Sequence, residues 1–387
     1  MNDGDLLEDR LSRLAASGVR VVDPRQTFVD ADVDLGRIHP TVTVHPGARL
    51  HGPRTFLGPG ASIGDEGPAV LVDAVIGEGA AVASGYVRGA VLLAGASLGA
   101  DSHVREGTLL EEGASTAHCV GLKQTILLPF VTLGSLINFC DVLMAGGTSR
   151  RDHSEVGSGF IHFNFTPWGE AGDKATASLV GDVASGVFLD RRRIFLGGAG
   201  GMIGPRSVGF GAITGAGQML RRDVPEAHLV VEAAPAIDLP VRPPGSRQAE
   251  QIRRRNVEYL GQLAALRAWY RQVRLPRASA AGAPHLETVT AEAAANVEAC
   301  IAERWHRLER FVAERGQTLP ALGELDPPPC PLPLDGGLDG GTDGGGGAGG
   351  HAGHVEWVQS LPPDAVRAGR EWLEAVAAQA HARLSGG

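Results

Sequence analysis

The stretch LLAGASLGADSHVREGTLLEEGAS, residues 92–115, places an aliphatic residue at every sixth position. Leu92, Leu98, Val104 and Leu110 each open a hexapeptide, and small or acidic residues follow them. A period of six fits neither the 3.6-residue period of a helix nor the alternation of an amphipathic strand. It is typical of short strands joined by tight corners, where three hexapeptides make one triangular coil and stacked coils share a core.

The same period recurs on both sides of this stretch. Earlier series run through Ile38, Val44 and Leu50 and then through Val70, Ile76 and Val82, with slips of one residue at corners. Glycine supplies 55 of 387 residues, against an average usage of about 7%, as tight corners require. The sequence predicts a mainly β protein with a left-handed parallel β-helix over residues 20–224, and irregular excursions near 142–175 and 187–201.

The flanking segments have other patterns. Residues 1–19 are predicted to form a capping helix that stops at Gly18. Residues 225–322 have helical patterns at 246–274 and 287–315, so we expect an α-helical region after the β-helix. Residues 323–354 are rich in glycine and proline and are predicted to be a flexible linker. Residues 355–387 are expected to carry a last helix.

Charge and composition narrow the class of partner. The net charge of −9 argues against nucleic acid or an anionic membrane, because both require a concentrated basic surface. The acidic start of the chain does not resemble a signal peptide, and no run of 18 apolar residues occurs, so a cytoplasmic location is expected. The four cysteines show no CxxC pair, which predicts neither a metal site nor a disulfide framework.

Three quotable segments resemble a known family. VGFGAITGAGQMLRRDV (208–224), GSGFIHFNF (157–165) and GSLINFCD (134–141) are similar to segments in the acetyltransferase half of the bifunctional N-acetylglucosamine-1-phosphate uridyltransferase/glucosamine-1-phosphate acetyltransferase family. GVRVVDP (18–24) resembles the entry into that family's β-helix. No glycine-rich loop of the nucleotidyltransferase half is found, so uridylyl transfer is not expected from this chain.

The resemblance implies a set of acceptor-binding residues. The family's sugar-phosphate arginine falls on Arg105 and its lysine, eighteen positions later, on Lys123. Its asparagine falls on Asn164 and a further lysine on Lys174, while Asn138 stands where the family has a tyrosine. Guanidinium and ammonium groups hold a phosphate, and an amide can orient sugar hydroxyls or an acetamide.

One position departs from the family. The catalytic histidine, twelve residues beyond the lysine, is replaced by Ser135. Transfer of an acyl group to an amine needs a base, and serine alone cannot act as one near neutral pH. Besides Ser135, the candidates for catalysis are His153 and His162, with His118 as a further histidine that could substitute.

The resemblance also implies an acyl-CoA co-substrate and a homotrimer with sites between subunits. Ser158, Ala216 and Gly217 match family positions that contact the cofactor. The first hypothesis is an acyl-CoA-dependent transferase acting on an amino-sugar phosphate or a UDP-sugar, in or near UDP-N-acetylglucosamine metabolism. The alternatives are a sugar-nucleotide-binding protein that lost the chemistry, and a non-catalytic partner of a separate nucleotidyltransferase.

Overall fold

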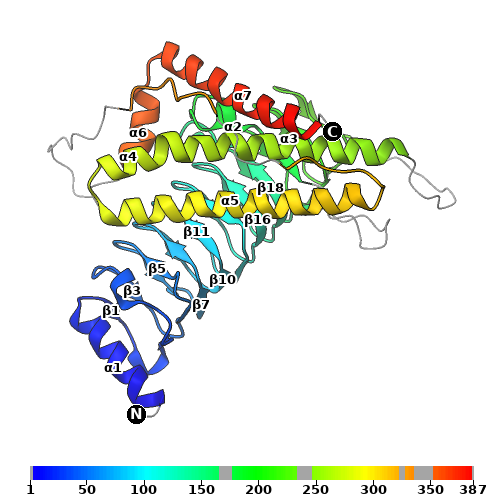
Figure 1. The fold of residues 1–387 in the computed structure, drawn as a ribbon. Coiled ribbons are helices and arrows are strands. Elements are labelled where there is room, and N and C mark those ends of the chain that lie inside the picture. Colours follow the sequence, from blue (N-terminus) through cyan, green and yellow to red (C-terminus); the bar gives the residue numbers. More distant parts are fainter. Residues whose placement is uncertain (1–2, 165–176, 233–245, 322–326, 335–351, 386–387) are drawn as a thin grey trace.

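The computed structural model describes residues 3–164, 177–232, 246–321, 327–334 and 352–385. Its main body is a left-handed parallel β-helix with three faces, which we name A, B and C in the order in which the chain visits them (Figure 1). Helix α1 (Asp3–Ala16) precedes the first coil and buries Leu11 and Leu14. The predicted fold class is therefore confirmed.

Face A is a single parallel sheet of eleven two-residue strands, one from each coil. Its inward positions stack in register: Val21 pairs with Val44, Val44 with Ile63, Ile63 with Val82 and Val82 with Leu98. This ladder of aliphatic side chains is the hexapeptide period seen in three dimensions. The strands are β1 (Arg20–Val21), β3 (Thr43–Val44), β6 (Ser62–Ile63), β9 (Ala81–Val82), β12 (Ser97–Leu98), β15 (Ser115–Thr116), β17 (Thr132–Leu133), β19 (Glu155–Val156), β22 (Phe195–Leu196), β25 (Ile213–Thr214) and β27 (Leu229–Val230).

Faces B and C are joined because two longer strands, β16 and β18, run around the corner between them and contribute to both. Face B consists of β2 (Phe28–Val29), β4 (Arg49–His51), β7 (Ala69–Val72), β10 (Gly85–Arg88), β13 (Ser102–Val104), the first halves of β16 (Gly121–Leu127) and β18 (Asn138–Met144), β20 (Ile161–Phe163), β23 (Gly201–Ile203) and β26 (Met219–Leu220). Face C consists of β5 (Phe56–Leu57), β8 (Val75–Ile76), β11 (Ala90–Leu92), β14 (Thr108–Leu110), the second halves of β16 and β18, β21 (Ser178–Val180) and β24 (Ser207–Val208).

The C-terminal region is helical. A long helix is built from α3 (Ser246–Trp269), a π-helical segment η3 (Tyr270–Arg274) and α4 (Leu275–Ala280), and α5 (Pro284–Ala313) runs back beside it (Figure 1). Helices α6 (Ala352–Ser360) and α7 (Pro363–Ser385) follow, and α7 packs on α3 and on the short helix α2 (Val183–Gly186). We call residues 246–385 the helical tail.

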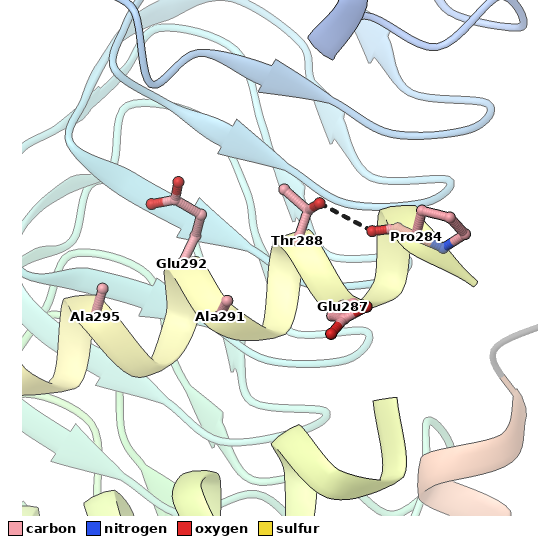
Figure 2. Close-up of a pocket in the computed structure, with 6 residues that line it drawn as sticks. All are labelled: Pro284, Glu287, Thr288, Ala291, Glu292 and Ala295. Atoms are coloured by element: carbon pink, nitrogen blue, oxygen red, sulfur yellow. Dashed lines mark hydrogen bonds between the residues drawn. The ribbon is translucent and has the colours of Figure 1, made fainter. Parts of the chain in front are cut away.

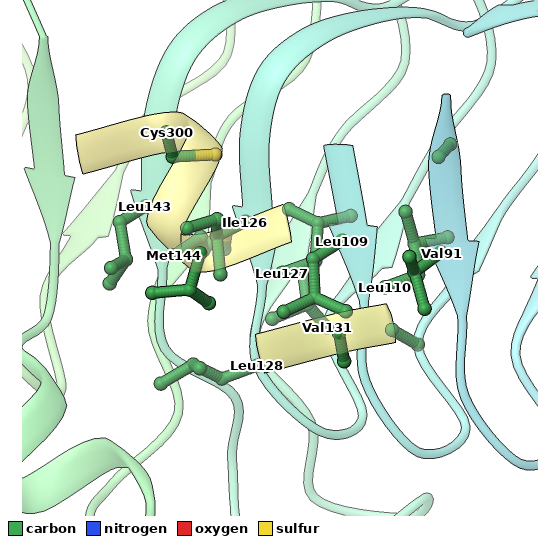
Figure 3. Packing of buried hydrophobic residues seen from close by; sticks show 14 of the residues in the cluster. Val91, Leu109, Leu110, Ile126, Leu127, Leu128, Val131, Leu143, Met144 and Cys300 are labelled. Carbon is green, nitrogen blue, oxygen red and sulfur yellow. The ribbon is translucent and has the colours of Figure 1, made fainter. Parts of the chain in front are cut away.

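Helix α5 lies on face C. Its buried residues recur at helical spacing, including Val289, Ala293, Val297, Cys300 and Leu308, so one stripe faces the solenoid. Figure 3 shows this packing, with Cys300 close to a layer of face C side chains in register on successive coils, Leu109, Ile126 and Leu143. Within the described residues the tail packs on face C and leaves faces A and B open.

Part of the predicted linker is packed. Leu332 is buried, and the indole nitrogen of Trp372 donates to the carbonyl oxygen of Pro328 at 2.8 Å. Helix α6 begins at Ala352, within the predicted linker. These contacts come from apolar and proline residues at 327–334, whereas the glycine-rich run at 335–351 lies outside the described residues.

Candidate functional site

Face B presents two outward columns of side chains. The first passes through His103, Gly121 and Asn138, which are in register on successive coils. The second lies two residues further along each strand and passes through Arg105, Lys123 and Cys140. Neighbouring coils are about 4.8 Å apart, so Arg105 and Lys123 are adjacent cations. The eighteen-residue spacing of this pair is one coil of the β-helix.

In the middle of these columns Gly121 leaves a patch of face B without a side chain, which we call the Gly121 floor. A Cβ atom built at this position would meet only the side chain of Asn138, at 3.8 Å, and the carbonyl oxygen of His103, at 4.0 Å. Lys123 follows on the same strand, and His103 is exposed and stacked on Tyr86 with ring centroids 5.3 Å apart. The floor is therefore open and bordered by polar groups that can donate or accept hydrogen bonds.

Ser135 lies at the corner between faces A and B, three residues before Asn138. Its hydroxyl donates to the Ser158 hydroxyl at 3.0 Å, and its backbone N–H donates to the same atom at 3.1 Å. His118 occupies the equivalent corner position one coil earlier, since the N–H of Leu136 donates to the His118 carbonyl at 3.1 Å. His118 is exposed and is the histidine nearest in the stacking to Ser135.

The same corner continues through the later coils as a ridge of small residues. Ser158, Gly198 and Ala216 occupy successive coils, and the N–H of Gly217 donates to the Gly198 carbonyl at 2.9 Å. A Cβ at Gly197 would lie 2.6 Å from the backbone nitrogen of Ala216, so bulk is excluded from this ridge. Ser158, Ala216 and Gly217 are thus brought onto one edge of the solenoid.

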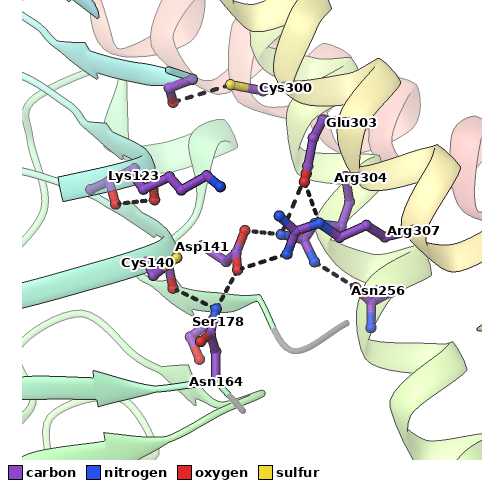
Figure 4. Close-up of polar contacts among 12 residues, drawn as sticks. Lys123, Cys140, Asp141, Asn164, Ser178, Asn256, Cys300, Glu303, Arg304 and Arg307 are labelled. Carbon is purple, nitrogen blue, oxygen red and sulfur yellow. Dashed lines mark hydrogen bonds and ion pairs between the residues drawn. The ribbon is translucent and has the colours of Figure 1, made fainter. Parts of the chain in front are cut away.

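Asn164 lies at the corner between faces B and C, where it meets a buried carboxylate. Its side-chain nitrogen donates to Asp141, whose side chain is fully buried, and lies 3.4 Å from the Cys140 carbonyl oxygen. Arg304 of α5 pairs with the other oxygen of Asp141, and Arg307 lies 3.5 Å from Asp141 (Figure 4). The sequence reasoning missed both arginines, because nothing in a solvated helical pattern indicates which solenoid corner it covers.

His162 points into the solenoid. It is one of the inward positions of face B, in register with Met202, and only 3% of the residue is exposed. Its Nδ1 lies 2.6 Å from the Cys140 carbonyl and its Nε2 lies 2.9 Å from the Ser178 hydroxyl. Burial lowers the pKa of His162 to about 4. With both ring nitrogens engaged, this neutral imidazole does not face the Gly121 floor.

His153 lies just before β19 on face A, not on face B. Its Nδ1 is 2.9 Å from the Arg150 carbonyl oxygen and its Nε2 is 3.6 Å from Glu155. It is therefore separated from Lys123 by the width of the solenoid. Lys174 lies outside the described residues.

Other features of the described chain carry no part of this site. A hollow beside α5 is lined by residues of that helix alone: Pro284, Glu287, Thr288, Ala291, Glu292 and Ala295 (Figure 2). Among the described residues no group of three or more histidine, cysteine or acidic side chains could hold a metal ion. No helix in the same ranges is both long and apolar enough to cross a membrane.

Comparison with known proteins finds bifunctional GlmU proteins among the relatives of this chain. No family model matches the chain. It is 30% identical over 259 residues to the bifunctional protein GlmU of Kineococcus radiotolerans, a match that covers 66% of this chain and 47% of that protein. GlmU of Nocardia farcinica is 30% identical over 225 residues, covering 58% and 40%, and GlmU of Mycobacterium marinum is 28% identical over 246 residues, covering 62% and 44%. The chain thus spans about half the length of the curated relatives it matches.

Proposed function

We propose, from the resemblance to the acetyltransferase half of the GlmU family that these matches and the β-helix bear out, that this protein is an acyl-CoA-dependent transferase. Its acceptor is an amino-sugar phosphate or a UDP-sugar, in or near UDP-N-acetylglucosamine metabolism. The observation that carries the proposal is the Gly121 floor, which is bordered by Lys123 and Asn138 on face B.

The acceptor phosphate is held by Arg105 and Lys123. The two residues are adjacent on neighbouring coils, and two cations at that spacing can share one phosphate. The sugar then lies over Gly121, where the missing side chain leaves room, with Asn138 beside it as a hydrogen-bonding group. Asn164 borders the same end of the site at the next corner, and Lys174 remains part of the proposed acceptor set.

The base is His118. Because it lies at the corner three residues before Gly121, where β16 begins, it stands at the end of the floor opposite the cations, at most about 18 Å from Lys123 along an extended backbone. A hexosamine phosphate whose phosphate is held at Lys123 extends its ring toward this histidine. Neutral imidazole can take the proton that the amine loses on attack. His153 and His162 do not face the floor, and Ser135 is left to orient the donor or the amine.

The acyl donor is acetyl-CoA or another acyl-CoA, and it lies along the small-residue ridge. A narrow pantetheine chain suits an edge where Ser158, Ala216 and Gly217 present little beyond backbone. No metal takes part in the proposal.

A homotrimer supplies the second wall of this groove. The open faces carry exposed apolar side chains in the late coils, among them Ile161, Phe163, Met219, Ile213 and Leu229, of which Leu229 is 69% exposed. Patches of this kind mark protein interfaces. Since face C is covered by the tail, faces A and B are the ones available to neighbouring subunits.

Ser135 also favours a second function, a sugar-nucleotide-binding protein without turnover. Its hydroxyl is committed to Ser158 and does not replace the imidazole that the family has at this position. In that case the pocket binds and no acyl group moves.

Thiol release from acetyl-CoA distinguishes the transferase from the binding protein. We expect turnover with glucosamine-1-phosphate or a related amino-sugar phosphate, abolished by Lys123→Ala and reduced at least about 100-fold by His118→Ala, the usual contribution of a general base. His45→Ala, on an early coil, is the control and should leave turnover unchanged. Full activity in His118→Ala contradicts the assigned base. No turnover by the wild type, with UDP-N-acetylglucosamine still raising the melting temperature, supports the binding protein.

A further inference from the structure

The helical tail reaches the acceptor site through one buried carboxylate. Asp141 is fully buried at the turn where β18 leaves face B for face C, and its backbone φ is +62°. A buried charge persists only when it is paired and hydrogen-bonded. Arg304, Arg307 and Asn164 are the groups that satisfy it in the described chain.

We infer that the tail takes part in acceptor binding: Arg304 and Arg307 of α5 hold Asp141, and Asp141 fixes the side-chain amide of Asn164. The inference rests on the proposed function, because Asn164 is one of its acceptor residues. Arg304 and Arg307 are thus positioning residues rather than catalytic ones.

The tail acts on the orientation of the Asn164 side-chain amide. Asn164 turns its NH₂ group toward Asp141 and the Cys140 carbonyl, so its oxygen faces the other way, as an acceptor. A carboxylate accepts hydrogen bonds and cannot donate them, which excludes the flipped amide. The carboxylate is held in place because the guanidinium of Arg304, itself only 2% exposed in its side chain, pairs with it.

This network also lies beside the cations of face B. The positive charges of Arg307 and Lys123 both act on the thiol of Cys140, the residue opposite Lys123 on the next strand. Figure 4 shows Lys123 extending on the same side of the sheet as the Arg304 and Arg307 cluster. Glu303 of α5 pairs with both arginines, so Arg304 and Arg307 are balanced by Glu303 and Asp141, and the net positive charge at this end of the site comes from Lys123.

The competing explanation is that the Asp141 ion pairs only attach the tail to the β-helix. The tail already has such an attachment elsewhere, where Arg274 pairs with Glu112 and lies 3.7 Å from Glu111. Buried ion pairs add little net stability compared with an apolar contact of similar volume, so a second one is poorly explained by docking alone. Its position at the corner that carries Asn164 is explained by the acceptor site.

The test uses the five asparagines of the chain. In full-length protein labelled with ¹⁵N-asparagine, the side-chain NH₂ signals are few enough to assign by substitution of each asparagine. Arg307→Gln should shift the Asn164 NH₂ signals, and Arg310→Gln, an exposed arginine one turn further along α5, should not. Arg304→Lys keeps the buried charge and should restore most of the wild-type pattern where Arg304→Gln fails to fold.

Binding gives the second readout. We expect Arg307→Gln to raise KM for the amino-sugar phosphate, or Kd for UDP-N-acetylglucosamine, by about tenfold with a much smaller change in kcat, the loss expected for one charge-assisted contact. Unmoved Asn164 signals in Arg307→Gln, or unchanged affinity with moved signals, overturn the inference. If the wild-type protein binds no acceptor, the proposed function fails, and the NMR comparison still decides whether the tail positions Asn164.

Discussion

Replacing Glu111 by glutamine should stabilise the protein at alkaline pH, although it removes a charge that lies 3.7 Å from Arg274. Glu111 is 1% exposed, and burial, followed by repulsion from Glu112, raises its pKa from 4.5 to about 7. Arg274 is committed to Glu112 through both terminal nitrogens, so it compensates Glu111 only in part. The Tyr270 hydroxyl at 2.6 Å donates to Glu111 and can donate equally to a glutamine oxygen.

The sign and size follow from the two pKa values. Because the folded state keeps the Glu111 proton to higher pH than the unfolded chain, this group favours folding at pH 4.5 and below, and stability declines as pH rises from 4.5 to about 7. A shift of this size corresponds to about 3 kcal/mol in the free energy of unfolding. Glu111→Gln imitates the protonated group, so its advantage over the wild type should grow to about 3 kcal/mol by pH 8 and vanish near pH 4.5.

Urea unfolding at pH 5, 6.5 and 8 measures this difference. Tryptophan fluorescence is a suitable signal because Trp269 and Trp372 lie in the helical tail that Arg274 anchors. Glu106→Gln, an exposed glutamate on the same coil, is the matched control and should change nothing beyond about 0.5 kcal/mol. A Glu111→Gln variant that is less stable than wild type at pH 8 would refute the reasoning, since it would mean that Glu111 is ionised and favourably paired.

Two further predictions concern the solenoid. Gly85→Ala places a Cβ 2.7 Å from the Ser102 backbone nitrogen at a φ of +114°, so we expect a loss of at least about 2 kcal/mol in urea unfolding. Gly95→Ala, where nothing lies within 4 Å of the added atom, should cost only about 1 kcal/mol. Leu110→Ala removes a fully buried side chain and should lower the free energy of unfolding by about 2–5 kcal/mol, whereas Val22→Ala, at 43% exposed, should cost well under 1 kcal/mol.

The coil architecture was predictable because its signal repeats in the sequence. Each inward position of face A, such as Val44, Ile63 and Val82, reports the same stacking contact one coil later. A period that recurs along the chain fixes the strand register without further information. The tail carries no such repeat. Its helices can be predicted from apolar spacing, but that spacing does not identify which face they cover.

The site residues also fall into those that the repeat predicts and those that it does not. Arg105 and Lys123 could be placed side by side from their spacing, since eighteen residues is one coil. For His162 the sequence leaves two readings open, a base for catalysis or a residue stacked inside the coils, and the structure shows the second. Arg304 is separated from Asp141 by 163 residues, and only the docking of α5 brings them together. Contacts of that kind have no local signal in a single sequence.

The stacking also explains how a catalytic group can move without the site being rebuilt. His118 and Ser135 are seventeen residues apart, the same interval that separates the paired Ser115 and Thr132 on face A. Exchanging a histidine at one coil for a histidine at the next displaces the imidazole by about 4.8 Å along the solenoid axis. A solenoid therefore offers equivalent positions at regular steps. The serine at position 135 is compatible with catalysis if the base stands one step away, which is where His118 lies.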